Sequence, residues 1–282
     1  MYAHVNGVDL FFDIEGGGYV PEGPTVVEKP TLVLLHGGPG CDQSYFKPWL
    51  LPLTDQVQLL LVDHRGNGRS GRVDERTYTI EQMADDLEAL RHHLGLGPIM
   101  VLGHSFGGMV AQVYALRHPQ SVSKLILSNT APSADFWEEA QEMADRMATP
   151  EQLAVLPALF EGRITSQEEF DQWWETCMPL YFHKPDAAII TEVEGRMRGE
   201  VVVANYMMAN EIPKYDVRPG LASVTAPTLV IAGRYDWVTP VSQSEAIIEA
   251  LPGAQLVIQE ESGHMGFIEE TEGYLSAVRA FL

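Results

Sequence analysis

Short and almost wholly apolar runs recur along the chain, and the longer segments between them have apolar residues at helical spacing. Runs of this kind are typical of strands that helices cover on both faces of a parallel sheet. The strands predicted in this way comprise residues 31–35, 59–62, 99–102, 125–127, 228–232 and 255–258. The pattern therefore predicts an α/β fold, with a mostly parallel central sheet flanked by helices.

The start of the chain has a different pattern. Val5 leads into the turn residues Asn6 and Gly7, and residues 8–14 follow as a strand, which together is the pattern of a hairpin. Residues 16–30 are rich in glycine and proline, and we expect them to form a surface loop.

Helices are expected between the predicted strands. The clearest begins after the N-cap Thr79, which has Gln82 three residues further on, and it ends near Leu94. Two others are expected over residues 107–118 and 239–251. Helices alternating with strands in this way agree with the parallel sheet.

Residues 133–219 contain no run that is typical of a strand, and they are dense in Glu, Gln, Met and Trp at helical spacing. Amphipathic helices are predicted here over residues 135–147, 150–160 and 166–176. Because the predicted strands resume at residue 228, the segment is a helical insertion between two core strands. We expect an α/β core formed by residues 1–132 and 220–282, and a helical cap formed by residues 133–219.

Composition adds a strong imbalance of charge. The 39 acidic and 18 basic residues leave a formal net charge of −21. The electrostatic field of so negative a protein repels phosphate groups and anionic headgroups. We therefore expect neither nucleic acid nor a membrane surface as a partner. The same field would mildly favour the approach of a cationic substrate; the alternative interpretation is a role in solubility or salt adaptation alone.

Several classes of protein have sequence signals that this chain lacks. No run approaches the roughly 18 apolar residues of a membrane-spanning helix, and the amino terminus does not resemble a signal peptide. Two cysteines, Cys41 and Cys177, give no disulfide framework, so we expect a cytoplasmic protein with free thiols. No cluster has the spacing of metal ligands and no glycine loop has a nucleotide-binding pattern, so neither a metal nor a cofactor is expected. The oligomeric state stays open.

Residues 103–107 read Gly-His-Ser-Phe-Gly and fit the pattern G-x-S-x-G. The motif directly follows a predicted strand and directly precedes a predicted helix, which is the context of a nucleophile elbow. The sharp turn of such an elbow lifts the serine hydroxyl clear of the sheet, and the flanking glycines permit the strained backbone. The pattern therefore identifies Ser105 as a candidate nucleophile.

A serine hydroxyl needs an adjacent base and an acid that orients this base. Asp236 and His264 each follow a predicted strand, so both lie at the sheet edge where ligands bind in open α/β folds. We expect His264 to take the proton of Ser105, and Asp236 to hold the imidazole tautomer. The other histidines near the site are interpreted as supports for its loops: His36, His64 and His104.

An oxyanion hole requires backbone N–H groups aimed at the developing negative charge. One donor is expected from Phe106, the residue after the nucleophile. The other is expected from the loop after residues 31–35, which reads His-Gly-Gly-Pro-Gly. Gly38 is the expected donor and Gly37 the alternative, because glycine lets this backbone approach a substrate closely.

Four segments together resemble the proline iminopeptidase group of the α/β-hydrolase fold. They are residues 36–40 (His-Gly-Gly-Pro-Gly), 63–70 (Asp-His-Arg-Gly-Asn-Gly-Arg-Ser), 103–108 (Gly-His-Ser-Phe-Gly-Gly) and 233–236 (Gly-Arg-Tyr-Asp). The resemblance implies a cofactor-independent hydrolase that removes an N-terminal residue, typically proline, from a small or short-peptide substrate. It also implies a cap glutamate that binds the free amine, and Glu211 matches that position best. We expect Trp237 and Gly37 to contact the substrate, with Phe106 also lining its pocket.

Two positions depart from the pattern of that group. Phe106 stands where tryptophan is common, and Trp237 stands where one branch has glutamate. An esterase, lactonase or small-molecule amidase with the same triad is therefore the alternative. Carboxylates converging near Ser105 would favour the aminopeptidase, and a wholly apolar pocket would favour the alternative. A binding protein without turnover is a third interpretation, which the intact triad disfavours.

Overall fold

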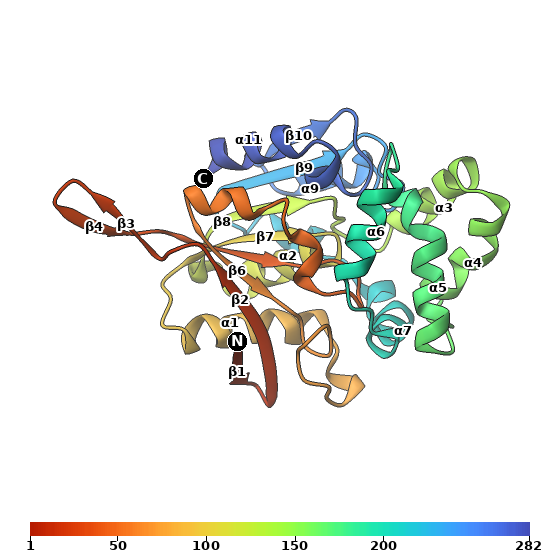
Figure 1. The fold of residues 1–282 in the computed structure, drawn as a ribbon, viewed down its shortest axis with the longest axis horizontal. Coiled ribbons are helices and arrows are strands. Elements are labelled where there is room, and N and C mark those ends of the chain that lie inside the picture. The colour runs from red at the N-terminus through yellow and green to blue at the C-terminus, as the bar shows by residue number, and fades with distance from the viewer.

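The computed structural model describes residues 1–282, apart from the side chain of Glu22. Its centre is an eight-stranded sheet in the order β1 (Tyr2–Val5), β2 (Val8–Glu15), β6 (Gln58–Val62), β5 (Thr31–Leu35), β7 (Ile99–His104), β8 (Val122–Ser128), β9 (Thr228–Gly233) and β10 (Gln255–Gln259) (Figure 1). From β6 to β10 in this order the strands run parallel to one another. β2 pairs antiparallel with both β1 and β6. The predicted α/β fold with a mostly parallel sheet is confirmed.

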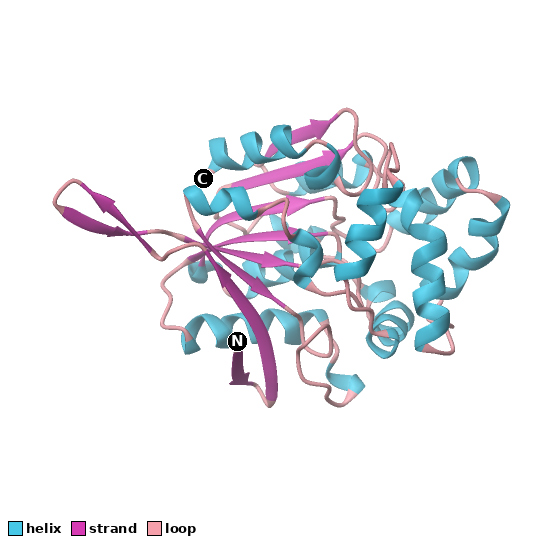
Figure 2. Cartoon of the chain, viewed as in Figure 1, coloured by secondary structure: helices cyan, strands magenta, loops and turns pink.

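Helices cover both faces of this sheet (Figure 2). The α-helices of the core are α1 (Ile80–His93), α2 (Phe106–Arg117), α8 (Arg218–Leu221), α9 (Val241–Ala250), α10 (Gly266–Glu269) and α11 (Thr271–Phe281). The chain also contains the short 3₁₀ helices η1 (Gln43–Phe46), η2 (Leu51–Asp55), η3 (Glu75–Thr77), η4 (Pro119–Ser121), η5 (Met178–Tyr181) and η6 (Ile212–Lys214). Because of this cover, every residue of β7 and β9 is buried, as their continuous apolar runs predict. In the part of the chain that the structure describes, no helix is long and apolar enough to cross a membrane.

The ends of α1 follow the capping signals of the sequence. The Thr79 hydroxyl accepts a hydrogen bond from the backbone amide of Gln82 at 3.1 Å, which satisfies one of the unpaired amides of the first turn. Beyond the last turn, Gly95 has a φ of +66°, a conformation that favours glycine after a helix. The first predicted helix is therefore confirmed at both ends.

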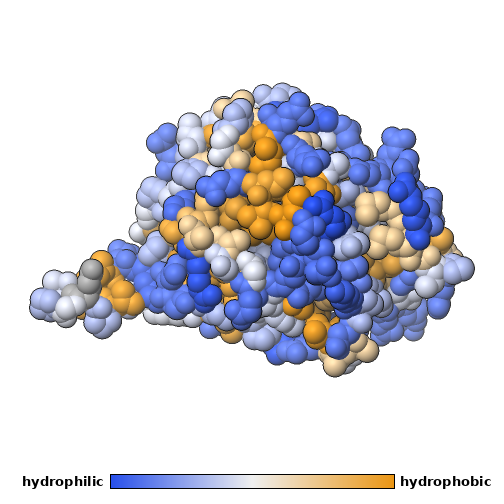
Figure 3. All heavy atoms as spheres, turned by 90° about the horizontal axis from the view of Figure 1, so that it is seen from above, coloured by the Kyte–Doolittle hydropathy of each residue, from blue (hydrophilic) through white to orange (hydrophobic). Residues whose placement is uncertain are grey.

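The beginning of the chain contains two hairpins. The turn at Asn6 and Gly7 joins β1 to β2, as predicted. Residues 16–30 were expected to form a loop, and this prediction is wrong, because β3 (Tyr19–Glu22) and β4 (Thr25–Glu28) pair antiparallel with each other. Most of the glycines and prolines lie at the turn or before and after the hairpin, but Pro21 lies within β3. Their density conceals the β-branched residues of the two strands. The hairpin stands away from the body of the molecule (Figure 1 and Figure 3).

Five of the α-helices between β8 and β9 in the chain gather at one end of the sheet (Figure 1). They are α3 (Phe136–Met147), α4 (Pro150–Phe160), α5 (Gln167–Cys177), α6 (Ala187–Arg196) and α7 (Val201–Asn210). The first three were predicted and the last two were missed. Backbone hydrogen bonds join Ala134 to Tyr215 at 2.8 Å and Val217 to Pro132 at 2.9 Å, so the inserted segment leaves and re-enters the core at one place. The division into core and cap at residues 133 and 219 stays a prediction.

A buried ion pair joins the loop after β6 to α1. The Arg65 guanidinium donates two hydrogen bonds of 2.6 Å to the Asp86 carboxylate, and both side chains are almost wholly buried. Asn6 donates a further hydrogen bond to Asp86, which connects the first hairpin to the same carboxylate. Arg65, within the segment of residues 63–70, therefore has a structural role, because it joins two elements of the core.

Replacing Asp86 with alanine should leave the Arg65 charge buried without a partner. We expect Asp86→Ala to lower the free energy of unfolding by about 3–5 kcal/mol, measured by urea denaturation. Glu142→Ala is the control, because it removes only the exposed pair with Arg146 and should change stability by less than about 1 kcal/mol. Equal losses in the two variants would contradict a structural role for the buried pair.

Candidate active site

Ser105 lies in the sharp turn between β7 and α2. Its φ of +55° is unusual for a residue with a side chain, and it marks a strained elbow. The glycines on either side are sterically required. A Cβ on Gly103 would lie 2.3 Å from the carbonyl oxygen of Gly107, and a Cβ on Gly107 would lie 2.1 Å from that of Leu35. The motif therefore has the backbone geometry that a nucleophile elbow needs.

Asp236 and His264 meet beside this elbow, although they follow different strands. His264 Nδ1 lies 2.8 Å from Asp236 Oδ2, and both side chains are buried. Burial would raise the pKa of Asp236, but the charge of His264 and hydrogen bonds from His264, Asn129 and Thr239 outweigh it and hold the pKa below its usual value. The carboxylate is therefore ionised at neutral pH and available to stabilise a protonated imidazole.

Asn129 is a residue of this site that the sequence analysis missed. It directly follows β8 and donates a hydrogen bond of 2.9 Å to Asp236 Oδ2. Its φ of +48° belongs to the left-handed region, which asparagine tolerates better than most residues. A polar residue at the carboxyl end of a buried strand was the available signal, since Asp236 was found in the same way.

The loop after β5 places its glycines against the elbow. The Gly37 amide donates a hydrogen bond to the hydroxyl of Tyr45, so it has no hydrogen left for a substrate. The amides of Gly38 and Phe106 have no acceptor among the residues that the structure describes. Gly38 has a φ of +121°, and a Cβ there would lie 2.9 Å from the amides of Gly40 and Cys41. Gly38 and Phe106 thus stay the candidate oxyanion donors, while Gly37 lines the cavity without a free amide.

A hydrogen-bond network ties together the three loops of the site. Tyr45 Oη lies 2.9 Å from His104 Nδ1, and His104 Nε2 lies 3.0 Å from the carbonyl oxygen of His264. Since Tyr45 accepts from Gly37, its own hydrogen can go to His104 Nδ1. The network then requires the His104 tautomer with hydrogen on Nε2, which donates to His264. Tyr45 was missed by the sequence analysis, and His104 was correctly placed near the site.

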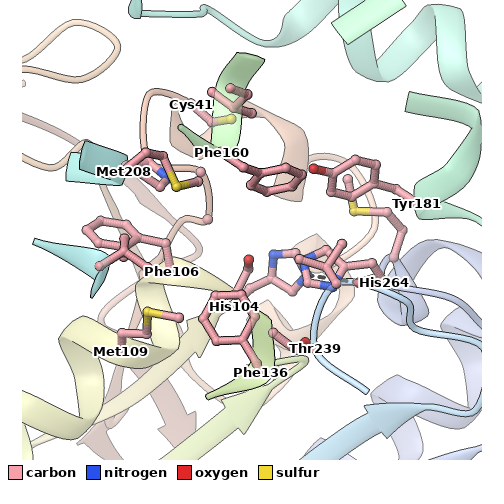
Figure 4. Close-up of a pocket in the computed structure, with 18 of the residues that line it drawn as sticks. Cys41, His104, Phe106, Met109, Phe136, Phe160, Tyr181, Met208, Thr239 and His264 are labelled. Atoms are coloured by element: carbon pink, nitrogen blue, oxygen red, sulfur yellow. Dashed lines mark hydrogen bonds between the residues drawn. The ribbon is translucent and has the colours of Figure 1, made fainter. Parts of the chain in front are cut away.

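The cavity above Ser105 has an apolar lining, and His264 lies at its edge (Figure 4). The aromatic and sulfur-containing side chains that line it come from both the core and the inserted helices: Cys41, Tyr45, Phe106, Met109, Phe136, Trp137, Phe160, Trp174, Tyr181, Met197, Met208 and Met265. Among the described side chains that line the cavity, none is a carboxylate. The arrangement can exclude water around an acyl group, and it offers no counter-charge to a cation.

Two residues expected to contact the substrate lie outside this lining. Glu211 caps the end of α7, with its carboxylate 3.6 Å from Lys214 Nζ. Trp237 is buried and lines a second cavity next to the first. In the described part of the chain, no group of three or more His, Cys, Asp or Glu side chains could hold a metal ion, and independence of metals and cofactors stays a prediction.

Comparisons with known proteins extend over the whole chain. A family model described as alpha/beta hydrolase fold matches residues 30–153, and one described as TAP-like protein matches residues 199–282. Proline iminopeptidase PfmaB of Pestalotiopsis fici is 31% identical over 289 residues, covering 100% of this chain and 98% of that protein. An alpha/beta fold hydrolase of Bacillus anthracis is similar in structure, with a TM-score of 0.80 and 24% identity over 100% of this chain and 98% of its own. The enol-lactonase of Burkholderia xenovorans has a TM-score of 0.71 and 25% identity, over 100% of this chain and 99% of its own.

Removing the Tyr45 hydroxyl should free the Gly37 amide and loosen the loop that carries Gly38. We expect Tyr45→Phe to lower kcat for an aryl ester by roughly fivefold with little change in KM, because one hydrogen bond is worth about 1 kcal/mol and the oxyanion forms only after binding. Steady-state kinetics measure both. Tyr114→Phe is the matched control, since that hydroxyl donates to Glu88 and its residue does not line the cavity. A loss confined to KM would argue against the network.

The buried imidazole of His104 predicts a loss of stability in acid. Burial, and then the charge of nearby His264, lowers the pKa of His104 to about 3. An unfolded chain binds this proton near pH 6.5, so between about pH 6.5 and 3 the unfolded state holds one proton more, and stability falls as the pH falls. His104 alone should lower the free energy of unfolding by about 2 kcal/mol between pH 7 and pH 5. Urea denaturation at both pH values should show that this pH-dependent difference disappears in His104→Asn. It should remain in His93→Asn, which changes an exposed histidine and is the control.

Proposed function

The chain belongs to the α/β-hydrolase family, and we propose that it is a serine hydrolase that cleaves small neutral esters, lactones or amides with an apolar acyl group. The lining of the cavity above Ser105 carries this proposal, because its described side chains include no carboxylate. A substrate ammonium buried there would lose its water without gaining a counter-charge, which costs several kcal/mol. A neutral acyl group would instead gain from contact with the aromatic and methionine side chains.

In the proposed reaction, Ser105 Oγ attacks the carbonyl carbon while His264 Nε2 takes the hydroxyl proton. Asp236 holds the hydrogen on His264 Nδ1 and stabilises the imidazolium that forms. The amides of Gly38 and Phe106 stabilise the negative oxygen of the tetrahedral intermediate. His264 then gives its proton to the leaving alcohol or amine, and the acyl group stays bonded to Ser105. A water molecule, deprotonated by His264, attacks this acyl-enzyme, and the acid leaves as Ser105 Oγ regains the proton.

The short-range environment of His264 supports this role. Its Nδ1 is engaged by Asp236, so Nε2 is the nitrogen left to face a substrate. The rings of His104 and Tyr181 pack against the imidazole, with centroids at 4.9 Å and 5.4 Å. These contacts restrict the ring to one orientation, which general-base catalysis requires.

An aminopeptidase is the second candidate, and a specific hollow favours it. This hollow shares Trp174 and Met197 with the catalytic cavity. The charged side chains that line it are Asp171, Glu175, Glu194, Arg198 and Glu200. Burial and the charge of Glu175 raise the pKa of Glu194, whose Oε1 has no partner among the described residues. A substrate whose amine reached past Met197 would find a carboxylate there, and the 31% identity with a protein named proline iminopeptidase supports this candidate.

A substrate panel tests the proposal. We expect kcat/KM for short aryl esters and acyl lactones to exceed that for prolyl-arylamide, and N-acetylation of the arylamide to leave its turnover unchanged or raise it. Ser105→Ala should lower turnover of every substrate by about 10⁶-fold, because the triad acts as a unit. Steady-state rates and burst-phase acylation measure these effects.

Two glutamates separate the candidates. If the free amine is preferred and Glu194→Gln lowers kcat/KM for prolyl-arylamide by about 10- to 100-fold, the aminopeptidase candidate replaces the proposal, since a charge-assisted hydrogen bond is worth ~1.5–3 kcal/mol. Glu211→Gln is the matched control, because Glu211 lines neither the catalytic cavity nor this hollow. It should leave amine and ester substrates unaffected.

A further inference from the structure

A second cavity lies directly beside the catalytic one, between α3 and α4. Its buried surface comes from Ala140 and Ala144 of α3, Leu156 of α4, and the neighbouring residues Trp237 and Val238. The polar residues that line it, Gln141, Asp145 and Glu161, are exposed and therefore lie at its rim. The interior is thus apolar and the entrance is acidic. No step of the proposed reaction uses this space.

An aromatic wall separates the two cavities. Trp137, Phe160 and Val238 line both of them. The rings of Trp137 and Phe160 meet edge to face with centroids 4.3 Å apart, and Phe160 meets Trp237 in the same manner at 5.9 Å. Among the described residues no hydrogen bond holds the Trp137 or Phe160 side chain, and both are only half-buried. A change of the Phe160 rotamer would therefore join the cavities without breaking a polar contact.

Trp237, which lines the second cavity, has an unpaired polar atom. Its indole Nε1 is buried and has no acceptor in the described part of the chain. A buried N–H group without an acceptor is destabilising, and an acceptor supplied by a ligand would relieve that cost. The rest of the buried lining is apolar, and Asp145 and Glu161 at the rim disfavour an anionic ligand. The fitting ligand is therefore a neutral, mainly aliphatic chain that carries a hydrogen-bond acceptor.

We propose that the second cavity is a subsite for the distal part of an elongated acyl group, a neutral chain with a carbonyl or other acceptor in its outer half, which enters past Phe160. The inference rests on the proposed function, because it places the ester or amide carbonyl at Ser105. The chain runs from Ser105 through the catalytic cavity and between Trp137 and Val238. Its acceptor then receives the hydrogen of Trp237 Nε1. Trp237 thereby contacts the substrate, although it does not line the catalytic cavity.

The first test is the dependence of kcat/KM on acyl length, from acetyl to dodecanoyl aryl esters. Ala144→Phe fills the second cavity and should lower the ratio of long-chain to acetyl activity by about tenfold or more, because each methylene that loses its buried place is worth roughly a fourfold change. Ala154→Phe, at an exposed position of α4 that lines neither cavity, should leave the ratio unchanged. Phe160→Ala removes the wall and should raise the ratio, so the test does not depend on one variant folding.

The second test concerns the indole N–H. Wild type should prefer a chain with a distal keto group over a plain chain of the same length, and Trp237→Phe should abolish that preference. The proposal is overturned if acetyl esters are cleaved but Ala144→Phe, Ala154→Phe and Phe160→Ala share one chain-length profile. If wild type cleaves no ester of any length and prefers an arylamide with a free amine, the proposed function is wrong, and so is this inference. The two failures are therefore distinguishable by the acetyl ester alone.

Discussion

Close approach of backbone to backbone around Ser105 is the constraint on which the site depends. The end of β5, the end of β7 and the start of α2 lie so near one another that no side chain fits at Gly103 or Gly107. The same crowding recurs where β9 and β10 end, since a Cβ on Gly233 would lie 1.9 Å from the carbonyl oxygen of Gly263. These contacts bring the loops after four parallel strands to one point, because the carboxyl ends of parallel strands share one edge of the sheet.

Burial of these loops determines which of their ionisable groups are charged and which are neutral. Removing a charge from water is costly, so a buried ionisable group either becomes neutral or collects hydrogen bonds. His104 is neutral, and it uses both ring nitrogens to join Tyr45 to the backbone of His264. Asp236 stays ionised because Asn129, Thr239 and His264 surround it with donors. The same buried region therefore holds a neutral histidine, His104, and an ionised carboxylate, Asp236, next to the imidazole of His264.

The inserted helices line much of the cavity above Ser105, and they therefore limit which substrates can bind there. They contribute Phe136, Phe160 and Met208 to the catalytic cavity, and none of their described acidic side chains lines it. The charge of −21 is therefore a property of the surface and not of the catalytic lining. Charge at long range would attract cations. In the proposed function the apolar lining nevertheless favours neutral groups, because a cation would lose its water there without gaining a counter-charge.

The sequence by itself determined the parallel sheet, the elbow at Ser105 and the positions of Asp236 and His264. Each leaves a local mark: continuous apolar runs for doubly covered strands, glycines where backbones touch, and polar residues directly after a strand. Only the tertiary structure decided that Tyr45 pairs with His104, 59 residues away, that Phe160 faces the cavity while Glu211 does not, and that residues 19–28 form a hairpin. The face that a helix turns toward a cavity, and the partner that a buried hydroxyl finds, are set by packing between segments distant in the chain. Spacing along one segment contains no record of that packing.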